Sequence, residues 1–180
     1  MFKSESDITG LSTGFSDLDK MTSGFQNSDL VIIAGRPSMG KTAFAMNVVE
    51  HAALNQNKPV LVFSLEMPAN QLVVRMLSSL GKIDQTRIRS GNLLEDDWPR
   101  LSAAAQKLKN ASLYIDDTPG ISPFEMKNRI KKFIREEMER IKSSLESENN
   151  DEQRNEKLLS MAQPSLIVVD YLQLMNGTNQ

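Results

Sequence analysis

The chain has 180 residues, a formal net charge of −2 and no cysteine. This length suits one domain, the small net charge excludes a protein that coats nucleic acid by charge alone, and the lack of cysteine excludes disulfides and thiolate metal sites. No apolar run approaches the length of a membrane span and the first residues have no signal-peptide core, so we expect a cytoplasmic protein without a membrane partner.

The opening residues are polar and read as a tether, and a short segment with helix-like apolar spacing follows at residues 10–24. Ser16 and Asp17 are placed to start a helix there, and Gly24 is placed to end it. We interpret this segment as a packing element at the edge of a sheet. An apolar run at residues 30–34 then predicts the first strand, covered on both faces as parallel strands are.

A glycine-rich turn follows this run with the P-loop pattern G-x-x-x-x-G-K-T and leads into a helix predicted over residues 41–55. Gly35 and Gly40 permit backbone angles and close approaches that a Cβ would block. Helix N-termini attract anions, Lys41 can reach the β- and γ-phosphates, and the Thr42 hydroxyl can bind Mg²⁺. The predicted nucleotide-binding residues are Gly35, Arg36, Pro37, Ser38, Met39, Gly40, Lys41, Thr42 and Ala43.

The alternative for this stretch is a Gly/Pro turn that joins a strand to a helix and binds nothing. The apolar run before the turn and the amphipathic helix after it favour a phosphate site. His51 lies on that helix. Nothing nearby in the sequence forms a proton relay, so we expect a solvent-facing or helix-end side chain there rather than a catalytic group.

A carboxylate follows the second predicted strand, the apolar run at residues 60–65. Glu66 would stand at the carboxyl end of a parallel strand, where α/β sheets bind ligands, and could deprotonate a water in line with the γ-phosphate. It could equally be an acid at the start of the next helix, which Pro68 suits and which Gly81 ends. Position alone leaves both roles open.

The middle of the chain is less informative. Residues 82–93 are turn-rich, and their role is not readable from the pattern. Asp97 is placed to cap a helix whose first turn contains Pro99. We expect Trp98 to be a packing anchor for that turn.

A third strand is predicted at residues 113–115, with Asp116 and Asp117 at its carboxyl end. Paired acids there could hold water or a metal, but capping and turn formation are the predicted use. Ser122 and Glu125 then have the spacing of a capping box, with proline at the first helical position, which predicts a helix start.

The long helix that begins there carries basic residues among glutamates, which favours an ordinary solvated helix with i,i+4 pairing over a nucleic-acid face. Residues 143–156 turn polar and read as a flexible excursion or the exposed end of that helix. The run at residues 166–169 predicts a fourth strand that ends in Asp170. This is a Walker B pattern, so Thr42 and Asp170 are the predicted metal residues.

Five stretches of the sequence together resemble one family. They are TGFSDLDKMTSGF, GRPSMGKTAFAMN, FSLEMP, IDDTPGIS and VVDYLQLM, and they are similar to the carboxyl-terminal motor domain of the DnaB-type replicative DNA helicases. The resemblance implies an α/β fold of the RecA-like P-loop NTPase class, with a mostly parallel sheet covered by helices on both faces and incomplete at its carboxyl-terminal side. It also implies an ATP-dependent DNA helicase that uses Mg²⁺, with Glu66 as the catalytic glutamate and Lys41 as the phosphate contact.

Members of this family assemble as hexameric rings, hydrolyse ATP between subunits and move along single-stranded DNA. The resemblance therefore implies that the full-length protein has other copies of the same subunit, single-stranded DNA, a primase and a helicase loader as its partners. Residues 1–9 would be the remnant of an interdomain linker, residues 10–180 a partial ATPase domain, and residues 143–163 an insertion or helix extension.

The resemblance also predicts what the chain lacks. In the family, the arginine finger and the DNA-binding loops follow the matched segment, and a later strand lies between the Walker A and Walker B strands. We therefore expect a fragment that is a poor ATPase alone and whose P-loop strand has unpaired edges. Two other readings stay open, namely a recombinase or clock-type RecA relative and a non-catalytic nucleotide-binding or assembly module.

Overall fold

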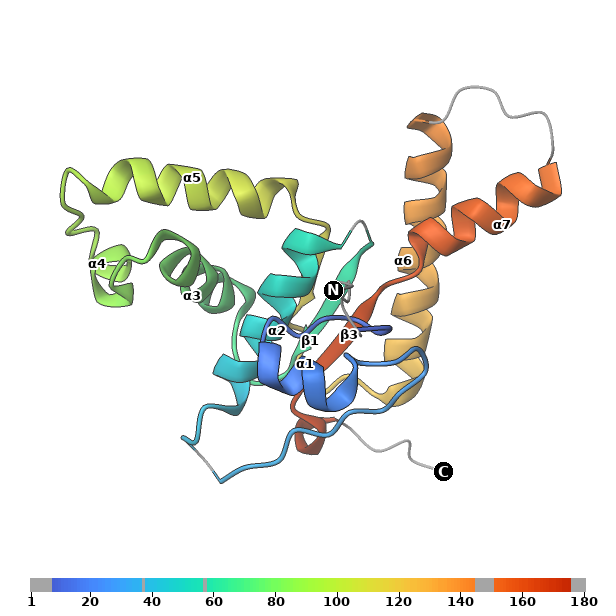
Figure 1. Ribbon diagram of the computed structural model, residues 1–180, viewed down its shortest axis with the longest axis horizontal. Coiled ribbons are helices and arrows are strands. Elements are labelled where there is room, and N and C mark those ends of the chain that lie inside the picture. Colours follow the sequence, from blue (N-terminus) through green and yellow to red (C-terminus); the bar gives the residue numbers. More distant parts are fainter. Residues whose placement is uncertain (1–7, 37, 57, 145–150, 176–180) are drawn as a thin grey trace, which may run out of the picture. The chain divides into compact units, whose positions relative to one another are not determined.

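The computed structural model of the chain describes residues 8–36, 38–56, 58–144 and 151–175. The chain divides into two compact units, each assembled from two separate stretches. Figure 1 labels the helices and strands along the chain. The first unit comprises Met1–Gln56 with Leu72–Ala111, and the second comprises Asn57–Gln71 with Ser112–Gln180. None of the helices in the described ranges is long and apolar enough to cross a membrane.

Helices make up the first unit. Helix α1 spans Ser16–Thr22, α2 spans Lys41–Asn55, and α3, whose first residues belong to the second unit, spans Ala69–Gly81. Helix α2 buries one apolar face, which includes Val48 and Val49. The predicted start of α1, both ends of α2 and the end of α3 are confirmed.

Residues 30–34 do not form the predicted first strand. Their backbone is irregular and their side chains face solvent, with Leu30 85% exposed and Ile32 71% exposed. A strand exists only where a neighbouring strand completes its backbone hydrogen bonds, and within the described residues no strand pairs with this run. The prediction of a buried strand here is wrong, whereas the lack of pairing expected from the family resemblance is confirmed.

The end of the first unit contains two more helices. Helix α4 spans Gln85–Ser90 and α5 spans Asp97–Asn110. The sequence pattern missed α4, which is short but has clear signals at both ends. The Asp84 carboxylate accepts a hydrogen bond from the Thr86 N–H at 2.7 Å, and Gly91 adopts the left-handed conformation that ends many helices.

Asp97 ties these two helices together. Its buried carboxylate accepts hydrogen bonds from the Leu94 N–H at 3.0 Å and from the Arg100 guanidinium, and it forms an ion pair with Arg87 of α4. The bond from Leu94 lowers the pKa of Asp97, and the two arginines add to this effect against the opposing effect of burial. Trp98 is 59% exposed, so its predicted role as a packing anchor is wrong, and Asp97 holds this turn instead.

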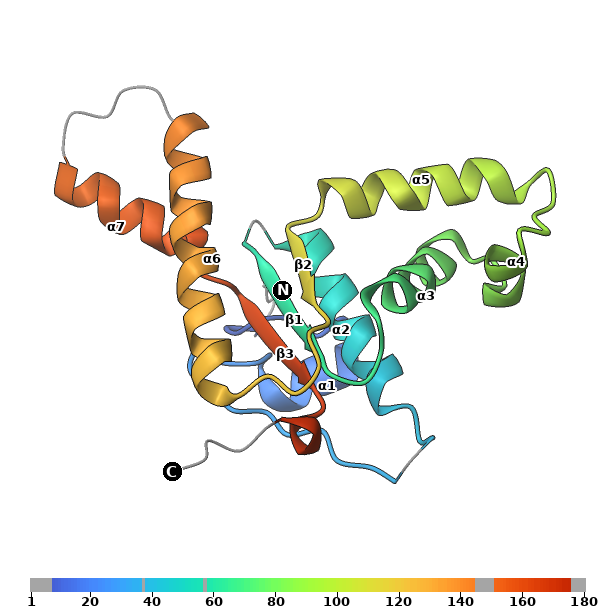
Figure 2. The same cartoon turned by 180° about the vertical axis from the view of Figure 1, so that it is seen from behind.

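The second unit is built on a three-stranded parallel sheet in the order β2-β1-β3 (Figure 2). Strand β1 spans Val60–Ser64, β2 spans Leu113–Asp116 and β3 spans Leu166–Asp170. Every residue of the central strand β1 is buried, as the continuous apolar run predicts for a parallel strand. The three strands that the sequence predicts in this unit are confirmed, and so is the α/β class.

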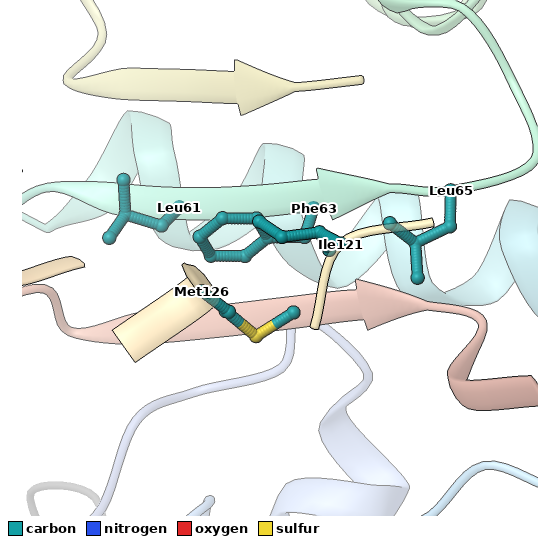
Figure 3. Packing of buried hydrophobic residues seen from close by; sticks show 5 residues of the cluster. All are labelled: Leu61, Phe63, Leu65, Ile121 and Met126. Atoms are coloured by element: carbon teal, nitrogen blue, oxygen red, sulfur yellow. The ribbon is translucent and has the colours of Figure 1, made fainter. Parts of the chain in front are cut away.

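Helix α6, which spans Pro123–Ser144, packs over one face of this sheet. Leu61, Phe63 and Leu65 project from β1 and the residue after it toward Ile121 and Met126, and these five side chains form a buried cluster (Figure 3). Because side chains alternate along a strand, three residues at a spacing of two line the same face. The cluster therefore fixes which face of β1 meets α6.

Helix α6 starts with the predicted capping box. The Ser122 hydroxyl accepts a hydrogen bond from the Glu125 N–H at 3.2 Å, and the Glu125 carboxylate accepts one from the Ser122 N–H at 2.9 Å. Further along, Lys132 and Glu136 form an i,i+4 ion pair, as predicted for a solvated helix. This ion pair agrees with the interpretation of α6 as an ordinary solvated helix rather than a nucleic-acid face.

Helix α7 spans Asp151–Ala162 and packs against α6, with Leu158 and Ala162 buried. The structure thus contains a second helix where the composition suggested a flexible excursion or the end of α6. Polar composition misled the prediction because a helix that buries one narrow stripe needs few apolar residues. Residues 145–150 lie outside the described residues, and the assignment of 143–163 as an insertion stays a prediction. A short 3₁₀ helix, η1, follows β3 at Leu172–Leu174.

Truncation of the Phe63 side chain tests the packing of the buried cluster between β1 and α6. Phe63 is 3% exposed, so Phe63→Ala should lower the free energy of unfolding by about 3–4 kcal/mol, because it removes buried contacts and leaves a cavity. Phe124 on α6 is a matched control, since it is 64% exposed and Phe124→Ala should change stability by no more than about 0.5 kcal/mol. Urea denaturation followed by circular dichroism measures both, and equal losses would contradict the packing described.

Candidate nucleotide site

The predicted phosphate loop precedes α2 in the first unit. Gly40, the residue before α2, has φ of +85°, and Ser38 has φ of +64°. The Met39 N–H donates to the Arg36 carbonyl at 3.2 Å, which closes the turn. Glycine adopts a positive φ without strain, so the pattern's requirement for Gly40 has a clear conformational cause. Pro37 lies outside the described residues.

The start of α2 suits an anion. Its N-cap residue is a glycine, so no side chain caps the first turn, and that turn carries no acidic residue of its own. The positive end of the helix dipole is therefore not offset by a carboxylate of α2. Lys41 and Thr42 are the first two residues of the helix, where the predicted phosphate and Mg²⁺ contacts require them.

A pocket of about 530 Å³ lies at this loop, a volume within the range of small-ligand sites. A Cβ at Gly35 would lie 3.3 Å from Lys41 Cγ, so glycine leaves room there for the stem of the lysine. Phe44 also borders the pocket, although the sequence analysis did not single it out. Its position three residues after the lysine is the only signal that could have indicated this. The lining residues are Ile33, Ala34, Gly35, Arg36, Met39, Gly40, Lys41 and Phe44.

Glu66 lies in the second unit, in the turn after β1, and its side chain is exposed. The Ser64 hydroxyl donates to the Met67 carbonyl at 2.6 Å and holds this turn. Helix α3 is capped by a different acid, because the Asp117 carboxylate accepts a hydrogen bond from the Ala69 N–H at 2.8 Å. Asp117 therefore has the capping role that the sequence left open for Glu66.

Asp170 is the last residue of β3, next to the β1 strand that precedes Glu66. It is in register with Ser64, and its carbonyl accepts a hydrogen bond from the Leu65 N–H at 2.7 Å. Glu66 and Asp170 thus follow adjacent parallel strands at the carboxyl edge of the sheet, where α/β sheets bind ligands. The structure brings these two predicted acids to one edge, while their approach to the phosphate loop stays a prediction.

Asp116 is the last residue of β2 at the same edge of the sheet, but its carboxylate already has partners. It accepts hydrogen bonds from the Thr118 N–H at 3.0 Å and from the Arg129 guanidinium at 2.6 Å. Burial acts to raise the pKa of Asp116, but the bonds from Thr118 and Arg129 outweigh it and lower the pKa. The predicted use of Asp116 and Asp117 in turn formation and capping is confirmed.

Comparison with known proteins identifies the family of this site. The model of the DnaB-like helicase C terminal domain matches residues 10–145, which include the phosphate loop, Glu66 and Asp116. That match covers more than half of the 180 residues. The chain belongs to the DnaB-like helicase C-terminal domain family.

Curated relatives support the assignment to this DnaB-like family. The replicative DNA helicase DnaB of Pasteurella multocida (strain Pm70) is 48% identical over 94% of the chain, and that of Haemophilus influenzae (strain ATCC 51907 / DSM 11121 / KW20 / Rd) is 46% identical over 97%. The replicative DNA helicase DnaC of Bacillus subtilis (strain 168) is 42% identical over 97%. The chain spans about a third of the length of each of these relatives, namely 32%, 33% and 33%.

Solved structures of DnaB-like proteins share the fold. The ATPase domain of G40P superimposes with a TM-score of 0.75 and 27% identity, over 98% of this chain and 54% of that one. A DnaB-like replicative helicase, whose structure was described with its interactions with primase, gives a TM-score of 0.70 and 27% identity, over 90% of this chain and 43% of that one. The predicted RecA-like fold class is therefore confirmed.

Proposed function

We propose that this chain is the nucleotide-binding part of the ATP-driven motor of a replicative DNA helicase. The observation that carries the proposal is the phosphate loop at the uncapped start of α2, in a chain of the DnaB-like helicase family. Glu66, two residues after β1, and Asp170, the last residue of the adjacent β3, would supply the two carboxylates that ATP hydrolysis requires, one for the water and one for the metal shell.

The proposed ligand is ATP with Mg²⁺. Thr42 and Asp170 would hold the metal, since a hydroxyl and a carboxylate are the oxygen ligands that Mg²⁺ prefers. Within the described ranges no group of three or more histidine, aspartate or glutamate side chains could hold a metal ion. Mg²⁺ usually keeps waters and binds through one or two carboxylates and the phosphates of its substrate, so one hydroxyl and one carboxylate from the chain would suffice. The bound metal would neutralise charge on the β- and γ-phosphates.

The chain's own residues would divide the remaining work. Gly40 and the first turn of α2 would bind the phosphates through backbone N–H groups, and the Lys41 ammonium would pair with the β- and γ-phosphates. Glu66 would orient a water and take its proton. The proposed partners of the full-length protein are other copies of the same subunit in a hexameric ring, single-stranded DNA, a primase and a helicase loader. A helicase that acts on DNA in this way would be cytoplasmic, as predicted.

Two alternatives to the helicase motor are a recombinase or clock-type RecA relative and a non-catalytic nucleotide-binding or assembly module. The names of the curated relatives favour a helicase over a recombinase or clock-type protein. A non-catalytic assembly module would bind nucleotide without turnover, whereas a motor hydrolyses it once the rest of the protein is present.

A chimera separates the motor from the assembly module. This chain should replace the matched 177 residues of the Haemophilus influenzae DnaB. The expected result is ATP hydrolysis stimulated by single-stranded DNA, together with unwinding of a forked duplex, and both should stop when EDTA removes Mg²⁺. A chimera that folds and binds ATP with Mg²⁺ but does not hydrolyse it would favour the assembly module.

A further inference from the structure

Three polar side chains from distant parts of the first unit meet beside α2. The Ser12 hydroxyl lies 2.7 Å from Asp19 Oδ2 and 3.0 Å from His51 Nε2, and the other oxygen of Asp19 accepts two hydrogen bonds from Thr13. On the far side of the imidazole, the Asn55 amide nitrogen lies 3.3 Å from His51 Nδ1. The structure therefore shows His51 partly buried and held in a network, where the sequence led us to expect a solvent-facing or helix-end side chain.

The proton positions in this network follow from counting donors. Asp19 is 2% exposed, and although burial acts to raise its pKa, the bonds from Thr13 and Ser12 lower it, so the carboxylate only accepts. The single Ser12 hydroxyl proton therefore goes to Asp19. The Ser12 oxygen must then accept from His51, which places the imidazole proton on Nε2 and leaves Nδ1 to accept from Asn55.

This direction of hydrogen bonds excludes a nucleophilic serine. In a Ser-His-Asp triad the serine donates to the histidine, which takes the proton. Here Ser12 donates to the acid and accepts from the histidine, so His51 cannot act as its base. The hydrogen bonds instead hold the segment of residues 12–19 against the second half of α2.

A second contact joins the same two segments near the phosphate loop. The ring of Phe15 stacks on that of Phe44, with centroids 5.0 Å apart and an angle of 24° between the planes. Phe44 borders the loop pocket, and His51 lies seven residues or about 10 Å further along the helix. Residues 12–19 therefore hold α2 at two points, and they are called the splint below.

We propose that the splint is a positioning device for the phosphate loop, with Ser12, Asp19 and His51 as its latch. This inference rests on the proposed nucleotide function of the loop. Helix α2 begins directly at the loop, so a helix held at two points keeps Lys41 and Thr42 in one place relative to Gly40. When the latch opens, fewer molecules have the binding-competent arrangement, and the apparent dissociation constant rises in proportion.

The first test determines by nitrogen-15 NMR of the chain which ring nitrogen of His51 carries the imidazole proton. His51 is the only histidine, so its ring resonances need no assignment by mutation. The expected tautomer carries the proton on Nε2. In Asp19→Asn the new amide can donate to Ser12, which turns the hydroxyl proton toward His51 and should move the imidazole proton to Nδ1. A wild-type chain with the proton on Nδ1 would overturn the latch.

The second test measures binding of a fluorescent ATP analogue with Mg²⁺. His51→Leu removes the donor to Ser12 and should weaken binding roughly tenfold, corresponding to a competent population near a tenth. His51→Gln is the conservative rescue, because its amide nitrogen can replace Nε2 as the donor, and it should restore most of the affinity. Asn47→Ala changes an exposed residue on the same helix and should leave the affinity unchanged.

Thermal unfolding identifies variants that fail to fold, and Ser12→Ala is the smaller substitution to use if His51→Leu is one of them. If a latch variant folds and still binds nucleotide with wild-type affinity, the positioning role is overturned and the proposed function stands. An equal loss in His51→Leu and His51→Gln also overturns it. A wild-type chain that binds no nucleotide overturns the proposed function, and this inference with it.

Discussion

Lys41→Ala is expected to weaken the binding of ATP with Mg²⁺ by about 100-fold. The ammonium would make charge-assisted hydrogen bonds to two phosphates, which together contribute about 3 kcal/mol, and each 1.4 kcal/mol is a factor of ten in affinity. The side chain lies close against Gly35 at the start of the loop pocket. Isothermal titration calorimetry of the chain measures the loss.

The control for Lys41→Ala is Lys107→Ala, which removes an exposed lysine from α5 and the same unit of charge. Its affinity should match that of the wild-type chain, because Lys107 does not line the loop pocket and exposed charges interact only weakly through water and salt. Equal losses in the two variants would mean that net charge and not the loop governs binding. Unchanged affinity in Lys41→Ala would remove the phosphate loop as the binding site.

The sequence predicted those parts of the site that depend on local chemistry. Helix α2 begins and ends where the pattern places it, and the capping box at Ser122 and Glu125 forms both of its reciprocal bonds. Each of these features is completed by residues within a few positions of one another. The three strands of the second unit were also predictable, because continuous apolar runs indicate buried parallel strands.

The features that the sequence did not predict depend on partners far away in the chain. The run at residues 30–34 has the composition of a strand, but a strand needs a neighbour, and composition does not say whether the neighbour is present. The bond between Ser12 and His51 joins residues 39 positions apart, which no periodicity marks. Asp117 caps α3 from 48 positions away, so the even choice for Glu66 could not be resolved from position.

The exposed run at residues 30–34 and the outer edge of strand β3 both lack a partner strand within the described residues. Within the described part of the chain, the outer edge of β3 has no partner strand, and Leu30 and Ile32 are largely exposed. Backbone groups and apolar side chains left in this state favour pairing with additional strands. The chain spans about a third of the length of the relatives it matches.

Glu66→Gln is expected to keep ATP bound and to slow hydrolysis by about 10²- to 10⁴-fold, the usual contribution of a general base. The amide has the shape of the carboxylate but cannot take a proton from water. Glu66 is exposed at the carboxyl edge of the sheet and does not cap α3, so the substitution should not disturb the fold. The measurement is the rate of phosphate release by the chimera, with nucleotide affinity determined in parallel.

Asp117→Asn is the matched control, since it removes an acid from the same edge of the sheet without touching the proposed chemistry. Asn remains an acceptable acceptor for the Ala69 N–H, so we expect a stability loss of about 1 kcal/mol or less and a hydrolysis rate close to that of the unaltered chimera. If Glu66→Gln hydrolyses ATP at the unaltered rate, Glu66 is not the base. If both variants lose hydrolysis equally, the turn after β1 matters for its geometry, and the carboxylate has no chemical role of its own.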